Sequence, residues 1–277
     1  MRVAAVALIL LLVGCSEAPN PRPSDEQLDD LRGKLAELSG VDSYEVDSVD
    51  YNYPRSTEID VEITTSDVAG LPALVTAATD LVDAAPLDDY PYEVRVTIGE
   101  SSLSVSTGYQ TNVAPADRAD TFVLWLTDPR VAAINWGWQL ELQLVGDGTA
   151  DGSLIEAVYG ELVSATTLAD GGMSITDPGS YSVATAQNPY SENRFAAARE
   201  IAALDGISGC SFSLDASSDG SYIHQIYCAV EGDAEATGTR INALLDARGL
   251  LESADVRLEA PDGYVTTHDG TYTFDED

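Results

Sequence analysis

Several short segments of this sequence alternate strictly between apolar residues and charged or polar residues. The clearest are residues 59–63, 92–98 and 138–144. A period of two residues places successive side chains on opposite faces of an extended chain. These segments are therefore predicted to be β-strands with one buried and one solvated face, which is typical of antiparallel sheets.

Amphipathic helices are predicted between the strands. Ser24 and Gln27 have the spacing of a capping box, and Gly40 follows the leucines of this first helix as a stop signal. Asp233 is a candidate N-cap for the last helix. The helices predicted after the first one cover residues 71–82, 117–127, 153–162, 191–204 and 234–247.

The elements follow one another as helix, two strands, helix, two strands, and this order occurs three times. The three units cover residues 25–109, 116–187 and 191–277, with short polar junctions between them. In each unit the first helix ends with a leucine before a turn, which indicates an internal repeat. The sequence therefore predicts an α+β protein of tandem small two-layer sandwiches. Each would have an antiparallel sheet with helices on one face, in a ferredoxin-like or permuted αββαββ arrangement.

The N-terminal segment has the features of an export signal. Residues 3–13 are apolar and uncharged, and Arg2 precedes them. A helix needs about 20 apolar residues to span a bilayer, so this run is too short and is typical of a secretory signal peptide. The run ends abruptly at Cys15.

Leu12, Val13, Gly14 and Cys15 resemble the lipobox of bacterial lipoproteins. The resemblance implies that residues 1–14 are a signal peptide and that Cys15 carries a diacylglyceryl group with acyl chains such as palmitate. The chain would then be attached by this covalent lipid to the extracytoplasmic face of the cell membrane. The alternative is an ordinary signal peptide that happens to contain a cysteine.

Residues 15–24 follow as the anchor and its spacer. Pro19, Pro21 and Pro23 stand among small polar residues there, which favours a stiff, extended segment. The whole chain has 47 acidic against 13 basic residues, a formal net charge of −34. Such a charge repels nucleic acid, so no nucleic-acid partner is expected.

Cys210 and Cys228 are predicted to form a structural disulfide. A three-residue loop at 218–220 joins their strands, and this loop length places the two cysteines directly opposite each other on one face of a hairpin. Such a pair suits disulfide geometry, and export to an oxidising compartment favours the bond. Two free buried cysteines are the alternative.

No catalytic residue is assigned, and no cofactor or metal is expected. The chain has two histidines. His224 shares a strand face with Ile226 and Cys228, which favours a partly buried structural imidazole, and His268 falls in a turn. Residues 206–210 approach a nucleophile elbow, but Cys210 replaces its last glycine.

Two acidic loops begin like calcium-binding EF-hand loops. They cover residues 147–152 and 215–220. An EF-hand loop needs glutamate at its twelfth position, where these have Val158 and Ile226. Tight turns are therefore favoured over metal sites.

Aromatic residues give the remaining candidates. Trp136 and Trp138 share the parity of inward-facing leucines, which predicts core packing; a sugar-binding platform would need them exposed. Four tyrosines near strand ends could form a polar aromatic recognition patch, and packing at strand ends is the alternative. These candidate binding residues are Tyr51, Tyr53, Tyr90 and Tyr92.

The sequence thus favours a lipid-anchored, non-catalytic binding or assembly module that acts with an envelope protein or a ligand. The sequence does not identify this partner. The alternative is a membrane-anchored hydrolase with a carboxylate-based site, and a third possibility is an envelope spacer. An enzyme is expected to have a deep pocket with perturbed carboxylates. A binding module is expected to have a shallow surface or a groove between units.

Overall fold

A computed structural model describes residues 22–275 apart from several short segments. Those segments are residues 53–54, 86, 88–89, 107–112, 147–151, 165–171, 179, 186–189, 217–221, 262 and 269–270. The predicted signal peptide and Cys15 therefore lie outside the described residues.

In the described part of the chain, a helix followed by two strands occurs six times, and one more strand ends the sheet. The helices are α1 (Asp25–Leu35), α2 (Leu71–Ala84), α3 (Pro115–Leu126), α4 (Ser153–Ser164), α5 (Glu192–Ala202) and α6 (Ala234–Ala247), with a short 3-10 helix at Leu251–Ser253. The strands are β1 (Ser43–Asn52), β2 (Arg55–Thr64), β3 (Tyr92–Ile98), β4 (Ser101–Ser106), β5 (Val131–Trp136), β6 (Leu140–Leu144), β7 (Met173–Thr176), β8 (Tyr181–Thr185), β9 (Ile207–Ala216), β10 (Tyr222–Val230), β11 (Ala254–Ala260), β12 (Gly263–His268) and β13 (Thr271–Asp275).

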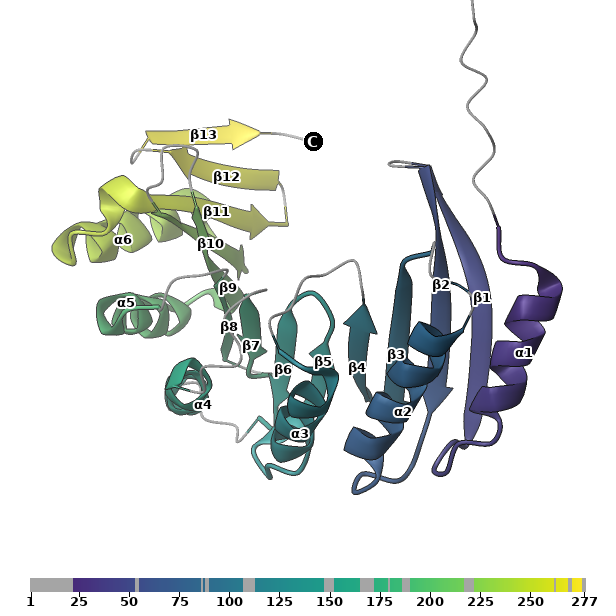
Figure 1. Ribbon diagram of the computed structural model, residues 1–277. Coiled ribbons are helices and arrows are strands. Elements are labelled where there is room, and N and C mark those ends of the chain that lie inside the picture. The colour runs from purple at the N-terminus through teal and green to yellow at the C-terminus, as the bar shows by residue number, and fades with distance from the viewer. Residues whose placement is uncertain are drawn as a thin grey trace, which may run out of the picture.

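The thirteen strands form one continuous sheet in the order of the sequence. The two strands of each repeat form an antiparallel hairpin, as β1 does with β2 and β3 with β4. Neighbouring repeats join through parallel pairs, such as β2 with β3. A helix carries the chain back between these strands, and a crossover of this kind produces parallel pairing. The strands line the inside of an open arc, and the helices lie along its outside (Figure 1).

The predicted α+β class and the placement of helices on one face are confirmed. Each predicted unit spans two of the six repeats. The prediction of purely antiparallel, separate sheets needs correction, because β4 pairs with β5 and β8 pairs with β9 in parallel across the unit junctions. Pairing across the junctions satisfies backbone groups that a separate sheet would leave exposed along its edge strands.

The apolar core lies between the sheet and the helices. On β2, Ile59, Val61 and Ile63 are at most 1% exposed, and the acidic residues between them lie on the other face. Each of the six helices contacts the strand that follows it. One face of the sheet is thus covered by helices, and the described residues leave the other face open.

The first helix begins as its sequence predicts. The Gln27 backbone N–H donates to Ser24 Oγ at 3.2 Å, and the Ser24 backbone N–H donates to Gln27 Oε1 at 2.8 Å. These reciprocal bonds satisfy two donors that a helix start leaves unpaired. The capping box is therefore confirmed.

The predicted pairing of Cys210 with Cys228 is confirmed. The register of β9 and β10 places the two residues directly opposite each other, with Cα atoms 4.2 Å apart and sulfurs at bonding distance. Both side chains are buried on the helix-covered face. The bond lies on the face opposite the open one, which agrees with a structural role.

His224 is completely buried, more deeply than the partly buried imidazole that its strand face predicts. Its Nε2 forms a hydrogen bond with the Tyr190 hydroxyl, and its ring lies near Phe212. Burial, with a smaller contribution from the positive charge of Arg194, lowers the pKa of His224 to about 3. Burial raises the pKa of Tyr190, so its hydroxyl stays protonated and shares this hydrogen bond with a neutral imidazole.

Candidate functional site

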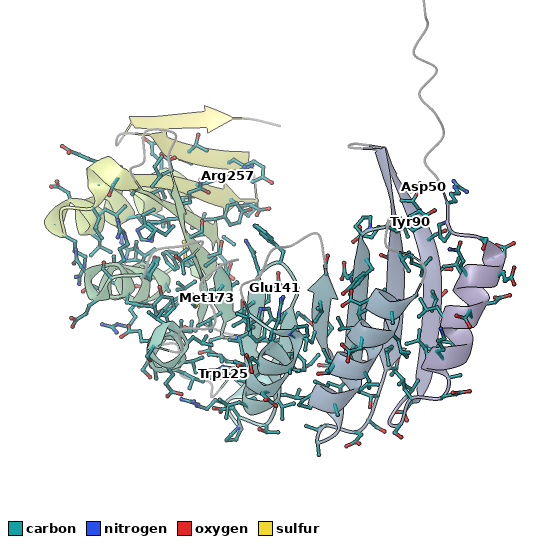
Figure 2. The ribbon with its side chains drawn as sticks, in the orientation of Figure 1. Asp50, Tyr90, Trp125, Glu141, Met173 and Arg257 are labelled. Atoms are coloured by element: carbon teal, nitrogen blue, oxygen red, sulfur yellow. A yellow bond between two sulfur atoms is a disulfide. The ribbon has the colours of Figure 1, made fainter. Side chains whose placement is uncertain are left out.

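The open face of the sheet is lined by the strand side chains that point away from the helices. These side chains are mostly small and polar, or charged. In Figure 2, Glu141 and Arg257 project from β6 and β11 toward the inside of the arc. The residues on the open face include Glu45, Asp47, Glu58, Asp60, Glu62, Glu93, Arg95, Thr97, Ser102, Ser104, Asn135, Glu141, Gln143, Ser174, Thr176, Ser182, Ser211, Ser213, Gln225, Tyr227, Asp255, Arg257 and Glu259.

A groove of about 590 Å³ crosses this face where β4 meets β5. The site lies at the junction of the first two predicted units. Its lining combines carboxylates, amides, hydroxyls, one guanidinium and one indole. The lining residues are Glu62, Arg95, Thr97, Gly99, Glu100, Ser101, Ser102, Ser104, Asn135, Gly137, Trp138, Gln139 and Glu141.

The groove forms because β4 and β5 overlap only briefly. Their register has two pairs, Ser102 with Asn135 and Leu103 with Trp136. Two serine hydroxyls supplement this short ladder. Ser102 Oγ donates to Asn135 Oδ1 at 3.0 Å, and Ser101 Oγ accepts from the backbone N–H of Ile134 at 3.0 Å.

Replacing Ser101 with alanine is expected to lower the free energy of unfolding by about 2 kcal/mol. The Ile134 N–H is buried, and a buried donor that loses its acceptor costs about 1–3 kcal/mol. Urea unfolding of the two proteins measures the difference. Ser102→Ala is the matched control, since its bond is exposed, and an effect of Ser101→Ala no larger than the control's would contradict the assignment.

Arg95 forms two ion pairs and a hydrogen bond at one side of the groove. Its Nη1 lies 3.3 Å from Glu62 and its Nη2 lies 2.8 Å from Glu93. Its Nε donates to Ser104 Oγ at 3.3 Å. Partial burial, followed by repulsion from Glu93, raises the pKa of neighbouring Asp60 above its ordinary value.

Trp138 is exposed, which corrects the prediction that it packs in the core. Its side chain is 58% accessible and lines the groove, whereas Trp136 is buried as predicted. β5 ends at Trp136 and β6 begins at Leu140, so residues 137–139 form a turn. The alternation of faces does not continue through a turn, and for that reason the parity of Trp138 was misleading.

A buried arginine holds this turn from the core side. Arg118 of α3 is 4% exposed, and its Nη2 donates to the carbonyl oxygens of Trp136, at 3.3 Å, and Gly137. Its guanidinium carbon lies 4.8 Å from the centre of the Trp136 ring, a cation–π contact. Burial lowers the pKa of Arg118 to about 10, so it remains charged at neutral pH.

Replacing Arg118 with methionine is expected to lower the free energy of unfolding by about 2 kcal/mol. The change keeps the buried stem but leaves two carbonyl oxygens without their donor, and relief of guanidinium desolvation offsets part of that cost. Urea unfolding of the two proteins measures the change in the free energy of unfolding. Arg240→Met on the exposed surface of α6 is the control, with an expected change of at most about 0.5 kcal/mol. Equal effects of the two substitutions would contradict the role given to Arg118.

The predicted tyrosine patch is only partly within the described residues. Tyr92 is 7% exposed, and its hydroxyl donates to Asp83 at 2.7 Å. Tyr90 is half-buried against the core. Tyr51 belongs to β1 but its side chain lies outside the described part, as does all of Tyr53. The structure thus brings neither Tyr90 nor Tyr92 to the groove.

A second, smaller groove of about 490 Å³ lies on the open face of β9 to β12. Arg257 lies in it, 4.3 Å from the centre of the Tyr264 ring and 5.9 Å from that of Tyr227. The Tyr227 hydroxyl donates to Glu259. In the sequence, both grooves are indicated by polar residues at every second strand position, which place polar side chains on the open face. That pattern alone does not indicate where the sheet is hollowed.

Among the described residues, no three or more histidine, cysteine, aspartate or glutamate side chains gather in a way that could hold a metal ion. The acidic loop at 147–151 and the tip of the one at 215–220 fall outside those residues. No described helix is both long enough and apolar enough to cross a membrane.

Comparison with known proteins found no matching family model, no matching curated protein and no matching solved structure.

Proposed function

We propose that this chain is a lipid-anchored, non-catalytic binding protein of the cell envelope, and that its ligand or partner binds on the open face of the sheet. The observation that carries the proposal is the polar groove at the junction of β4 and β5. A shallow groove between units is the kind of site expected of a binding module. A sheet face that keeps polar side chains from β1 to β11 suits an extended ligand.

The anchoring part of the proposal rests on the sequence around Cys15. The lipobox-like residues before it and the proline-rich spacer after it would hold the folded body a short distance from the membrane. The net charge of −34 would keep that body away from anionic lipid. The open face would then be accessible to components of the envelope.

The second candidate is an anchored hydrolase with a carboxylate-based site. The raised pKa of Asp60 favours it, because catalytic acids are kept protonated by burial and by acidic neighbours. Under this alternative, Asp60→Asn would abolish turnover of a bound ligand. The binding proposal predicts that neither protein turns the ligand over.

The test is photocrosslinking of the full chain in intact cells with a diazirine reagent, which inserts into C–H and O–H bonds of proteins and carbohydrates. We expect reproducible recovery of the same partner or ligand with the wild-type chain. Thr97→Arg in the lining of the β4–β5 groove is expected to reduce recovery, and Thr239→Arg on the exposed surface of α6 is the matched control. Failure to recover any reproducible adduct would contradict the binding proposal.

A further inference from the structure

We infer that the groove at the junction of β4 and β5 binds a neutral carbohydrate chain, with Trp138 as the stacking platform. The inference rests on the proposed binding function and names its ligand class. Three features of the groove carry it: an accessible indole, planar hydrogen-bonding side chains around it, and a net negative lining.

The indole is the first feature. Large aromatic side chains are normally buried, and Trp125 and Trp136 are at most 7% exposed, whereas Trp138 is 58% exposed at the groove. An indole face offers a flat apolar surface with a negative quadrupole. The axial C–H groups of a pyranose ring form a matching flat surface that carries a slight positive charge.

The turn that carries Trp138 is also held in place. The Gly137 N–H donates to the carbonyl oxygen of Gln139 at 3.1 Å, and Arg118 fixes the carbonyl oxygens of Trp136 and Gly137 from below. A platform on a fixed turn loses less conformational entropy on binding than one on a free loop. Trp138 is therefore exposed on a rigid support.

The hydrogen-bonding groups beside the platform are the second feature. Sugar hydroxyls both donate and accept, so planar side chains with two polar atoms can engage two neighbouring hydroxyls at once. Asn135, Gln139 and Glu141 are such side chains, and all line the groove. The Ser102 bond uses Oδ1 of Asn135, which leaves its Nδ2 group to donate to a ligand.

The charge of the groove is the third feature, and it selects among carbohydrates. Glu62, Glu100 and Glu141 outnumber Arg95 in the lining, and Arg95 is already paired with Glu62. A groove of net negative charge repels sugars that carry carboxylate, phosphate or sulfate groups. The favoured occupant is therefore an uncharged, hydroxyl-rich chain.

The experiment titrates the full chain, purified in detergent, with cellohexaose, chitohexaose and maltohexaose, and follows heat and tryptophan emission. We expect at least one of these neutral hexasaccharides to bind with a dissociation constant below about 1 mM. Binding should also protect Trp138 from acrylamide quenching. A galacturonate hexamer is the anionic control and is expected not to bind.

Variants locate the site. Trp138→Ala is expected to weaken binding about tenfold or more, and Trp138→Phe to retain most of the affinity. Leu124→Ala, at a residue exposed on the outside of α3, is the control and should bind as the wild type does. Thermal unfolding of each variant shows whether it is folded.

Three results would overturn the inference: no neutral hexasaccharide binding below about 1 mM, equal binding of the galacturonate hexamer, or undiminished binding by Trp138→Ala. If neutral sugars do not bind while adducts are still recovered through the open face in cells, the carbohydrate assignment is wrong and the proposed binding function stands. If neutral sugars do not bind and no adduct is recovered, both the carbohydrate assignment and the proposed binding function are wrong.

Discussion

Replacing Cys15 with alanine is expected to move the chain from the membrane fraction to the soluble fraction. Stable attachment requires two or more acyl chains, each contributing about 0.8 kcal/mol per buried CH₂ group, and alanine has no sulfur to carry them. The acidic body supplies no compensating attraction to anionic lipid, since acidic residues outnumber basic ones by 47 to 13. The measurement is labelling with palmitate followed by fractionation of the cells.

The matched control for this substitution is Ser16→Ala, which keeps the lipid acceptor and should stay in the membrane fraction. Two observations would contradict the anchor: absence of labelled palmitate from the wild-type chain, or retention of the Cys15→Ala chain in the membrane. Either would remove the proposed location while leaving the description of the fold unchanged.

Acidification is expected to destabilise the wild-type protein more than a His224→Gln variant. The unfolded imidazole has a pKa of about 6.5, and burial lowers the folded value to about 3. Between these values the unfolded state binds a proton that the folded state does not. The contribution of His224 to stability is therefore complete above pH 6.5 and is lost as the pH falls, by about 1.4 kcal/mol per unit.

Urea unfolding at pH 6.5 and pH 4 measures this difference. The wild-type free energy of unfolding should fall by about 3 kcal/mol more than that of His224→Gln across this range. Glutamine is neutral at both values and can still form a hydrogen bond with Tyr190. The many carboxylates titrate in both proteins, so the comparison cancels their contribution. Parallel pH dependence of the two proteins would show that His224 is not a buried neutral imidazole.

Local patterns predicted much of this fold. Strict alternation located β2 and β3, the Ser24 and Gln27 pair located the start of α1, and a three-residue loop predicted the pairing of Cys210 with Cys228. Each of these features depends on residues close together in the sequence. Periodicity, capping and loop length act at that range, and they are readable without a structure.

Features that depend on the pairing of strands far apart in the sequence could not be predicted in the same way. The parallel contact of β4 with β5 joins two strands separated by a helix, and nothing in the residue types of either strand specifies that neighbour. The groove follows from the short overlap of these strands. The exposure of Trp138 follows from the turn at 137–139, because β6 begins two residues later than the alternating pattern suggests. The candidate site thus became visible only with the strand order.

Binding on the open face can be tested by placing a diazirine amino acid at single positions of the full chain in intact cells. Gln143 on the open face and Leu124 on the outside of α3 belong to the same repeat, and both are exposed. Binding on the open face predicts a reproducible adduct from position 143 and none from position 124. Adducts from position 124 alone would contradict it, because the helix-covered side would then be the binding surface.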